Sequence, residues 1–594
     1  MFRPIDDYAL LSNLRCAALV SKGGSVDWFC PGRFDAPACF AALLGTADHG
    51  RWLIGPATGG ISTQRRYQPD TLVLETLFTC PLGQVRLIDA MPLGVNDCHL
   101  VRRVEGVSGR VSMRMLCVPR FGYGRDLPSV KQPSANQALF QCGQDLLRLS
   151  CEDAPLEAYN DSGLVQAEFE LSEGQQRSFV LSYGTVDEAF PSPPQIQPAL
   201  SQCAAWWQEW ISHSNYRGPW EEPVKRSLIT LKALTYEPTG GMVAAVTTSL
   251  PEVPGGEANY DYRYCWLRDA AFAVQTLLNS GYRSEACTWR DWLLKTVHQH
   301  DSHMHALYGV DGSIIDYEDE LDWLPGYANS RPVRNGNAAS DQYQLDVRGE
   351  LLEVLHLARD HGLDLSDDIW QLQCKILQRL EHCWHQPDEG IWEFRTICDH
   401  LTHSKVLSWT AFDRCIRDAE RFGLDAPVEH WKRTRKEIRE DILKCGVHPQ
   451  GGYFTQRYGS DNVDASLLMI PLVEFLPADD PRMQATIAAI EKELMSDGLI
   501  HRYRVGDQAN IEGQFLPCCF WLVDNYWLMG RHEEARSMFE HLLTLCNDVG
   551  LLSEEWDPHR QQLLGNFPQA LTHLALISSA RLITTGREED VTLT

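Results

Sequence analysis

The stretch Pro191-Ser192-Pro193-Pro194 divides the chain into two parts with different sequence patterns. Before it, short runs alternate between apolar and polar residues and are separated by turn residues, which is typical of β-strands. After it, residues 200–211 carry Trp206, Trp207 and Trp210 within a helical pattern. Clustered prolines stiffen a connection. The stretch therefore predicts a boundary between a β-rich part and a helical part.

The N-terminal part shows the alternation expected of half-buried strands. Residues 72–78 and 85–88 flank Pro81-Leu82-Gly83, which is a hairpin signal. Similar runs cover residues 111–116, 167–171 and 178–183. Short strands with turn signals between them predict a β-sandwich.

The C-terminal part shows helical periodicity. Val224, Leu228, Leu231 and Leu234 recur every three to four residues and so share one helical face. The remaining length would hold roughly a dozen helices of average size. A ring of helix pairs fits this part, because helical hairpins need only matching apolar faces.

Composition limits the class of partner. The 594 residues are enough for more than one domain, and 44% hydrophobic with 22% charged residues is ordinary for a globular protein. The formal net charge of -27 repels phosphate backbones, so we expect no nucleic-acid partner. Most of the eighteen tryptophans are expected in the core, and several are candidates for a carbohydrate site, where sugar rings rest on aromatic faces.

Cysteine usage and the termini point to a reducing compartment. Nineteen cysteines show no CxxC pair at zinc spacing, and an odd number argues against a complete disulfide framework. The N-terminus lacks an apolar signal core, and no stretch is long and apolar enough to span a membrane. We therefore predict a cytoplasmic protein with no membrane partner and no cofactor.

Two distant segments each place a carboxylate beside an aromatic residue. Leu552-Ser553-Glu554-Glu555-Trp556-Asp557 is one, and Ile391-Trp392-Glu393-Phe394-Arg395 is the other. Sugar hydrolysis uses one carboxyl group to protonate the leaving oxygen and another to activate water. Each segment alone is a weak signal, and together they suggest a glycosidase.

A third segment, Asn259-Tyr260-Asp261-Tyr262-Arg263-Tyr264-Cys265-Trp266-Leu267-Arg268-Asp269, precedes a strongly helical pattern. One interpretation is an ion pair that caps the helix above buried aromatic residues. The other is a polar clamp on a sugar, in which a carboxylate accepts from hydroxyls and a guanidinium donates to them.

These segments, in this order, match a known family over nearly the whole chain. The matching pieces are residues 260–264, 266–269, 390–393, 552–555 and 565–571, together with residues 5–10 and 24–28 near the N-terminus. The chain resembles glycoside hydrolase family 15, which contains glucoamylases, glucodextranases and bacterial trehalases. The resemblance implies an N-terminal β-sandwich, an (α/α)6 barrel, and hydrolysis of α-glucosides with inversion.

The resemblance also implies roles for single residues. Glu393 matches the general acid of the family, and Glu554 matches the general base because that carboxylate directly follows Ser or Pro in the family motif. Glu555 receives no role and is expected to support the site or to be exposed. Arg268 and Asp269 match the clamp on the glucose at the non-reducing end.

Four further residues are carried over with the family. Arg502 resembles a second arginine at the same sugar, Trp266 and Trp392 are expected ring walls, and Tyr327 is expected in a lid. An apolar flank would raise the pKa of the acid, whereas we expect the base in a wetter, hydrogen-bonded setting. Inversion requires the two carboxyl groups about 6.5–9.5 Å apart.

Other interpretations rank lower. His382, His385, His400 and His403 are too irregularly spaced for a metal cluster and are interpreted as polar loop residues. The acidic run 318–322 is interpreted as a solvated loop before the lid. The expected absence of a secretion signal and of a starch-binding module favours a short intracellular α-glucoside over starch.

We therefore predict an inverting, exo-acting α-glucoside hydrolase with trehalose as the leading substrate. A glucoamylase-type hydrolase of maltose, isomaltose or maltodextrins is the close alternative, and a catalytically silent sugar-binding protein is kept as a third. Homo-oligomerisation is left open. The predicted domains are a β-sandwich at 1–195, a linker helix at 196–220 and an (α/α)6 barrel at 221–594.

Overall fold

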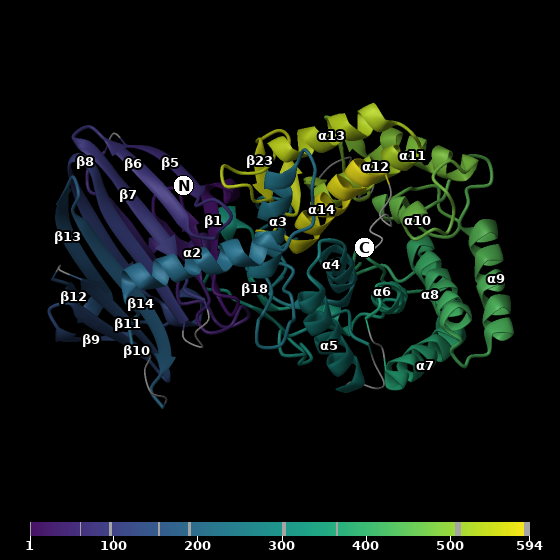
Figure 1. Ribbon diagram of the computed structural model, residues 1–594, viewed down its shortest axis with the longest axis horizontal. Coiled ribbons are helices and arrows are strands. Elements are labelled where there is room, and N and C mark those ends of the chain that lie inside the picture. Colours follow the sequence, from purple (N-terminus) through teal and green to yellow (C-terminus); the bar gives the residue numbers. More distant parts are fainter. Residues whose placement is uncertain are drawn as a thin grey trace.

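The computed structural model describes residues 2–59, 61–93, 98–152, 155–187, 192–299, 304–363, 366–504 and 512–586. Strands gather at one end of the molecule and helices at the other (Figure 1). Pro191 of the proline stretch lies outside the described residues, while Ser192, Pro193 and Pro194 lie within them.

The N-terminal part is a sandwich of two antiparallel layers that share one long strand, β8 (Cys98–Val118). The first half of β8 pairs with β7 (Gly83–Ala90) and β14 (Gln176–Thr185), and its second half pairs with β4 (Arg51–Pro56) and β13 (Leu164–Ser172). The pairing with β7 shifts register at Gln84/Val85, and Gly109 takes φ +64°. Such a bulge lets a strand bend from one layer into the other.

Strands such as β6 and β11 alternate buried with less buried residues, as the sequence predicts, whereas β1, β2 and β3 are buried along their whole length. The predicted hairpin is confirmed, since β6 and β7 pair antiparallel on either side of Pro81-Leu82. One layer contains β1 (Tyr8–Ser12), β2 (Ala17–Ser21), β3 (Ser25–Phe29), β4 (Arg51–Pro56), β12 (Glu157–Tyr159) and β13 (Leu164–Ser172). The other contains β5 (Ser62–Tyr67), β6 (Leu74–Cys80), β7 (Gly83–Ala90), β9 (Ser129–Ser134), β10 (Gln137–Cys142), β11 (Asp145–Glu152) and β14 (Gln176–Thr185).

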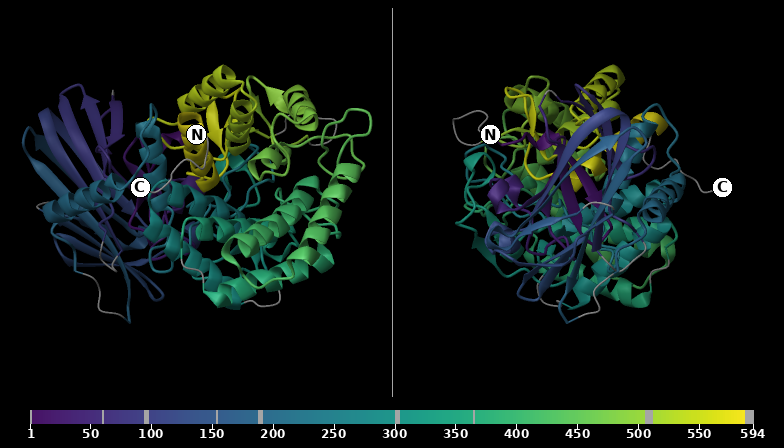
Figure 2. Two further views of the ribbon diagram at one scale, coloured as in Figure 1. Left: turned by 45° about the vertical axis from the view of Figure 1, so that its right-hand side comes forward. Right: turned by 90° about the vertical axis from the view of Figure 1, so that its left-hand side faces the viewer.

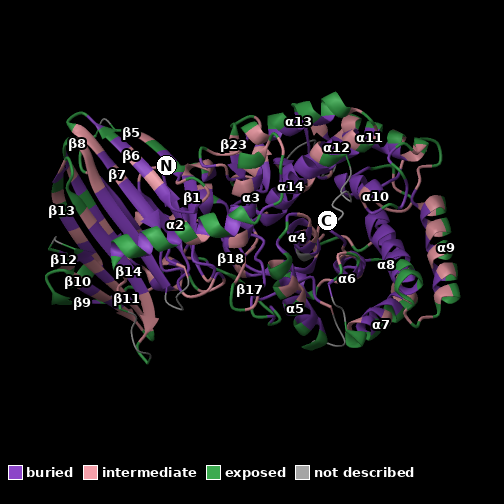
Figure 3. Cartoon of the chain, viewed as in Figure 1, coloured by how far each residue is buried: buried purple, intermediate pink, exposed green. Residues whose placement is uncertain are grey.

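Helix α2 (Ile196–Ser212) lies against the sandwich and leads to the helical part (Figure 1). Trp207 and Trp210 are buried on its inner face, and Cys203 Sγ donates to Met91 O of the sandwich. The outer face of α2 is exposed (Figure 3). The predicted helix with its tryptophans is confirmed, while the domain limits at 195 and 220 stay predictions.

The C-terminal part is a barrel of two concentric helical rings (Figures 1 and 2). In the described part of the chain, each inner helix contacts the next, and the last contacts the first. The inner helices are α4 (Leu267–Asn279), α6 (Asp346–Asp360), α8 (Thr402–Phe422), α10 (Met469–Leu472), α12 (Leu516–Leu528) and α14 (Ala570–Thr585). The outer helices are α3 (Glu221–Ala233), α5 (Arg283–Gln299), α7 (Asp367–Cys383), α9 (Val428–Cys445), α11 (Pro481–Leu494) and α13 (His532–Thr544).

The two rings differ in how their faces are buried (Figure 3). Helix α8 is buried over most of its circumference, whereas α9 buries one stripe that includes Trp431, Ile438 and Ile442. A helix enclosed by neighbours is apolar around most of its surface, and a helix on the outside needs only one apolar stripe. Among the described helices, none combines the length and apolar character needed to cross a membrane.

Candidate active site

The site lies at the end of the barrel where the inner helices begin. Arg268 and Asp269 belong to the first turn of α4, Glu393 lies in the connection before α8, and Glu554 lies in the connection before α14. These segments line a pocket with about 460 Å³ of empty space, part of which is open to solvent. Its lining residues are Ala244, Tyr262, Trp266, Arg268, Asp269, Ile391, Trp392, Glu393, Arg502, Phe515, Glu554, Gln569 and Leu571.

A larger outer compartment of about 1300 Å³ adjoins this inner pocket. Tyr262, Trp392, Glu393 and Arg502 line both, so they form the boundary between the two. Glu554 lines only the inner pocket among these two compartments. The two carboxylates therefore occupy different positions along one path from the outside inward.

Glu393 sits on this boundary with φ +55°, a conformation that is uncommon for a residue with a side chain. Its Oε1 accepts a hydrogen bond from the Trp266 indole at 2.5 Å and lies 3.6 Å from Arg268 Nη1. Burial raises the pKa of Glu393, although Arg268 and Trp266 favour the ionised form. A carboxyl group with a raised pKa at this boundary is placed where a leaving group could be protonated.

Glu554 lies deeper and is 3% exposed. Its Oε1 accepts a hydrogen bond from the Tyr262 hydroxyl at 2.8 Å. Burial and the neighbouring Glu252 raise the pKa of Glu554 to about 8, against the opposing effects of Arg502 and Tyr262. Gly565 has φ +76°, and a Cβ there would lie 2.8 Å from Glu554 Oε2, so a side chain at 565 would displace this carboxylate.

The environments of the two carboxylates differ from the sequence-based expectation. Glu554, the expected base in a wetter setting, is buried, whereas Glu393 is half-buried at the boundary. The expectation of hydrogen bonding holds, since Tyr262 donates to Glu554. The setting is drier because the carboxylate lies at the closed end of the pocket, and its ionised form depends on specific donors rather than on bulk water.

Arg268 and Asp269 lie side by side in the inner pocket. Arg268 Nε donates to Asp269 Oδ1 at 3.2 Å, and its Nη1 donates to Ile391 O at 2.9 Å. Asp269 is 2% exposed, and burial raises its pKa. Their polar atoms supply a donor and an acceptor at the closed end, as a clamp on sugar hydroxyls requires.

Arg502 also lines the inner pocket, and two carboxylates hold it. Its guanidinium binds Glu252, and its Nε donates to Glu512 Oε1 at 3.0 Å. Burial raises the pKa of Glu252 to about 7. Glu252 and Glu512 have no aromatic flank or recognisable motif in the sequence, and they were not predicted for the site.

Two residues predicted as ring walls line the inner pocket, whereas the residue predicted in a lid lies away from it. Trp392 lines both compartments and donates from its indole to Asp464 Oδ2 at 2.8 Å, and Trp266 lines the inner pocket. Tyr327 lines neither compartment. Its hydroxyl donates to Arg3 O at 2.8 Å and its ring packs on Phe2, so this residue joins the barrel to the N-terminal segment instead.

Tyr262 lines the pocket and bonds Glu554, and the sequence did not predict it for the site. It lies in the quoted segment four residues before Trp266, and residues separated by an even number share one face of an extended chain. This alternation is the sequence signal that could have placed Tyr262 on the same side as Trp266. Glu555, in contrast, is fully buried and accepts from Gly513 N at 3.0 Å, so it supports the backbone rather than lining the inner pocket.

In the described residues, two groups of three side chains bring their oxygen or nitrogen atoms close enough to share an ion: His356, Asp360 and Asp418, and Glu252, Glu512 and Glu555. Arg359 binds Asp418 in the first group, and Arg502 binds two members of the second. Because an arginine supplies the positive charge in each group, we interpret both as ion-pair networks. Neither group contains His382, His385, His400 or His403.

Comparison with known proteins relates both parts of the chain to carbohydrate-active enzymes. Residues 218–581 match the model of glycosyl hydrolases family 15, and residues 2–184 match the model described as trehalase-like, N-terminal. A bacterial glucoamylase solved in complex with acarbose covers 98% of this chain with a TM-score of 0.73. That alignment covers 94% of the glucoamylase at 12% identity, a likeness that shows the shared fold.

Curated relatives are similar over nearly the full length. A trehalase of Mycolicibacterium smegmatis is 37% identical over 99% of this chain and 92% of its own length. A trehalase of Thermoplasma acidophilum is 36% identical over 95% of this chain and 97% of its own length. With the family model matching most of the chain and these relatives matching nearly all of it, the protein belongs to glycosyl hydrolase family 15.

Proposed function

We propose that this protein is an inverting, exo-acting hydrolase that cleaves trehalose into two glucose molecules. The observation that carries the proposal is that Glu393 and Glu554 face one pocket from different depths, beside Arg268 and Asp269. Sugar hydrolysis needs such a carboxyl pair, and fixed polar groups to orient the sugar.

Glu393 acts as the general acid in this proposal. It lies between the inner and outer compartments, where the glycosidic oxygen between two sugars would sit. The Trp266 indole fixes one carboxyl oxygen. The other oxygen would carry the proton to the leaving sugar.

Glu554 acts as the general base on a water molecule at the closed end. The base must be ionised, so we expect activity to rise with pH through the pKa of Glu554. The Tyr262 hydroxyl and Arg502 support the ionised form, and Glu252 opposes it. The attacking water would approach the sugar from the side opposite the leaving group, which inverts the anomeric centre.

The pocket shape supports an exo mode and a short substrate. Arg268 and Asp269 line the inner pocket and not the outer compartment, so one terminal glucose would be held there. The outer compartment of about 1300 Å³ would receive the second sugar and release it to solvent. Trehalose is favoured over longer chains because the full-length relatives are trehalases.

The decisive experiment compares four substrates. The purified protein is incubated with trehalose, maltose, isomaltose and soluble starch, and released glucose is measured, with Glu554→Gln as the inactive control. We expect the highest kcat/KM with trehalose. A higher value with maltose, isomaltose or starch would favour the glucoamylase-type alternative. Sugar binding without glucose release from any of the four would favour a silent binding protein.

We also propose a cytoplasmic location. The chain has nineteen cysteines, an odd number that argues against a complete disulfide framework, and a chain of this kind suits a reducing compartment. Homo-oligomerisation stays a prediction, which light scattering of the purified protein tests.

A further inference from the structure

One extended segment separates the catalytic pocket from the N-terminal sandwich. Residues 260–264 run beside residues 244–249: the Ser249, Ala245 and Ala244 amides donate to the carbonyls of residues 260, 262 and 264 at 2.9–3.0 Å. Every second residue of an extended chain points to the same side. Asp261 and Arg263 therefore face away from the side that Tyr262 presents to the pocket.

The pocket side of this segment holds both carboxylates of the proposed mechanism. Tyr262 donates to Glu554 at 2.8 Å, and Trp266 donates to Glu393 at 2.5 Å. The two rings pack edge to face with centroids 5.3 Å apart. The position of this segment therefore determines how Glu554 is hydrogen-bonded, and Trp266, two residues beyond it, carries the bond to Glu393.

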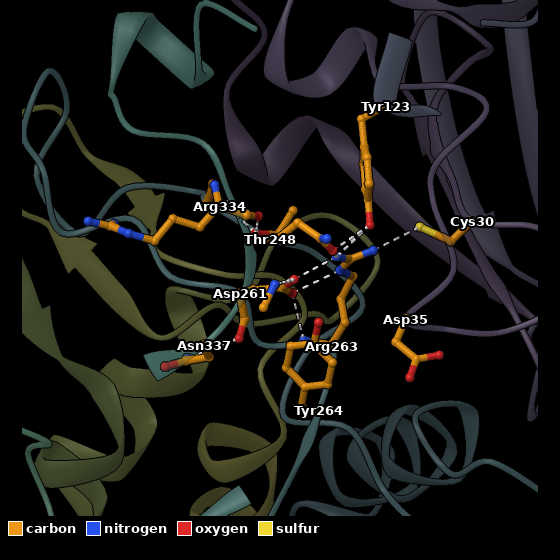
Figure 4. A network of polar contacts seen from close by, with 12 residues as sticks. Cys30, Asp35, Tyr123, Thr248, Asp261, Arg263, Tyr264, Arg334 and Asn337 are labelled. Carbon is orange, nitrogen blue, oxygen red and sulfur yellow. Dashed lines mark hydrogen bonds and ion pairs between the residues drawn. The ribbon is translucent and has the colours of Figure 1, made fainter. Parts of the chain in front are cut away.

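The opposite side of the segment is bound to the sandwich through Arg263, which is 0% exposed (Figure 4). Its Nε donates to Asp261 Oδ1 at 2.8 Å, within the barrel. Its Nη1 donates to Ala36 O and its Nη2 to Tyr123 Oη, each at 3.0 Å, and both partners belong to the N-terminal part. One guanidinium thus joins the catalytic segment to the other domain.

Tyr123 completes this connection. Its hydroxyl accepts from Arg263 and donates to Asn335 Oδ1 at 2.8 Å, so both hydrogen-bonding capacities are used. Tyr123 is 5% exposed and has φ +60°, which is costly for a residue with a side chain. Strained residues persist where surrounding contacts determine their position, and such residues often serve function.

We propose that Arg263 and Tyr123 are positioning residues, through which the N-terminal sandwich fixes Tyr262 against Glu554. The inference rests on the proposed function, because the group that Tyr262 supports, Glu554, is the general base only in that proposal. The Tyr123 hydroxyl positions the Arg263 guanidinium, and the bound guanidinium fixes the backbone at residue 263. Because Tyr262 is the preceding residue, its hydroxyl is then held in place against the Glu554 carboxylate. Small displacements of a catalytic group cause large losses in rate, so the domain contact contributes to turnover.

The test uses Tyr123→Phe, which keeps the ring and removes the hydroxyl. We expect a folded protein whose kcat on trehalose falls roughly tenfold. We also expect the acidic limb of its kcat/KM profile to move to higher pH, because a weaker Tyr262 contact favours protonated Glu554. Ser12→Ala is the matched control: it removes another hydroxyl that joins the N-terminal part to the barrel, bonded at 2.8 Å to Ala233 O at the end of the outer helix α3, and should leave kcat and the profile unchanged.

A double-mutant cycle separates positioning from general loosening. If Tyr123 acts through Tyr262, Tyr123→Phe should change kcat less than twofold when Tyr262→Phe is already present. A full tenfold loss in that background would overturn the proposal, as would an unchanged kcat and pH profile in Tyr123→Phe itself. Should Tyr123→Phe fail to fold, Arg263→Lys keeps a positive charge beside Asp261 and must show the same pH shift for the proposal to stand.

These outcomes are distinct from failure of the proposed function. If the wild type releases no glucose from any of the four sugars, or if Glu554→Gln retains full activity, the catalytic assignment is wrong. If the wild type hydrolyses trehalose, Glu554→Gln does not, and Tyr123→Phe behaves as wild type, only the positioning role is wrong.

Discussion

The Tyr262 hydroxyl donates a hydrogen bond to Glu554 Oε1 at 2.8 Å, at the closed end of the inner pocket. It is a specific support for the ionised form of a carboxylate whose pKa burial and Glu252 raise to about 8. The balance between these groups determines the pH range in which the proposed base is ionised. Each group either raises or lowers the pKa of Glu554, and a single substitution tests which.

Tyr262→Phe should raise the pKa of Glu554 further, because it removes a donor that stabilises the carboxylate. Only the ionised base activates water, so the acidic limb of the kcat/KM profile should move to higher pH, with a lower kcat at neutral pH. Tyr264→Phe is the control. Tyr264 lies on the same segment as Tyr262, but its hydroxyl contacts the Tyr317 hydroxyl, at 3.3 Å, and not Glu554. An unmoved limb in Tyr262→Phe would contradict the assignment of Glu554 as the base.

Glu252→Gln should shift the same limb in the opposite direction. Glu252 raises the pKa of Glu554 by like-charge repulsion, and it also binds Arg502, which favours the ionised form. Removing the charge lowers the pKa of Glu554, so activity should extend to lower pH. Glu237→Gln, which removes a remote acid paired with Arg15, should leave the profile in place. A shift to higher pH in Glu252→Gln would show that the coupling runs through another group.

The two-part fold could be predicted from the sequence because its signals are local. Periods of two and 3.6 residues follow from strand and helix geometry, and the change between them falls near the proline stretch. The pairing of Glu393 with Glu554 could not be derived in this way, since it depends on how distant connections meet, and it came from the resemblance to a family.

The remaining site residues depend on contacts that no local pattern encodes. Glu252 binds Arg502 across 250 positions of sequence, and neither its neighbours nor its spacing indicates that contact. Tyr327 was predicted in a lid because its loop resembles the long loop of the family, and that role stays a prediction. Its hydroxyl bonds to a backbone carbonyl of the N-terminal segment, and no sequence motif indicates a contact with a backbone carbonyl, because every residue has one.

Asp269→Asn should impair turnover while leaving the fold intact. The carboxylate is buried beside Arg268, and in the proposed site it accepts hydrogen bonds from sugar hydroxyls that strengthen in the transition state. A lost hydrogen bond to a charged group corresponds to a decrease in kcat/KM of roughly ten- to hundredfold. Circular dichroism should match the wild type. Unchanged kcat/KM in a folded variant would mean that Arg268 and Asp269 form only a structural ion pair.

The stereochemistry of the first product tests whether the two carboxylates act through water. If Glu554 activates water opposite the leaving group, one glucose from trehalose should first appear as the β-anomer. Proton NMR of a fresh reaction distinguishes the anomers before mutarotation. If all the glucose formed at early times were the α-anomer, the reaction would proceed through a covalent intermediate, and the inverting mechanism would be wrong.

The last prediction separates the roles of the two carboxylates. Glu393→Gln cannot donate a proton, so it should lose roughly 10²–10⁴-fold in kcat on trehalose, whose leaving sugar requires protonation. It should lose much less on α-glucosyl fluoride, because fluoride leaves with little assistance. Glu554→Gln should impair both substrates, since every inverting turnover needs an activated water.

Glu555→Gln is the matched neighbour for this experiment, because Glu555 accepts from the Gly513 amide and does not line the inner pocket. It should keep most of the activity on both substrates. Equal losses of Glu393→Gln and Glu554→Gln on both substrates would overturn the assignment of acid and base. If Glu555→Gln lost its activity while Glu554→Gln remained active, Glu555 rather than Glu554 would be assigned as the general base. The hydrogen bond from Tyr262 argues against that outcome, because it reaches Glu554, the carboxylate that lines the pocket.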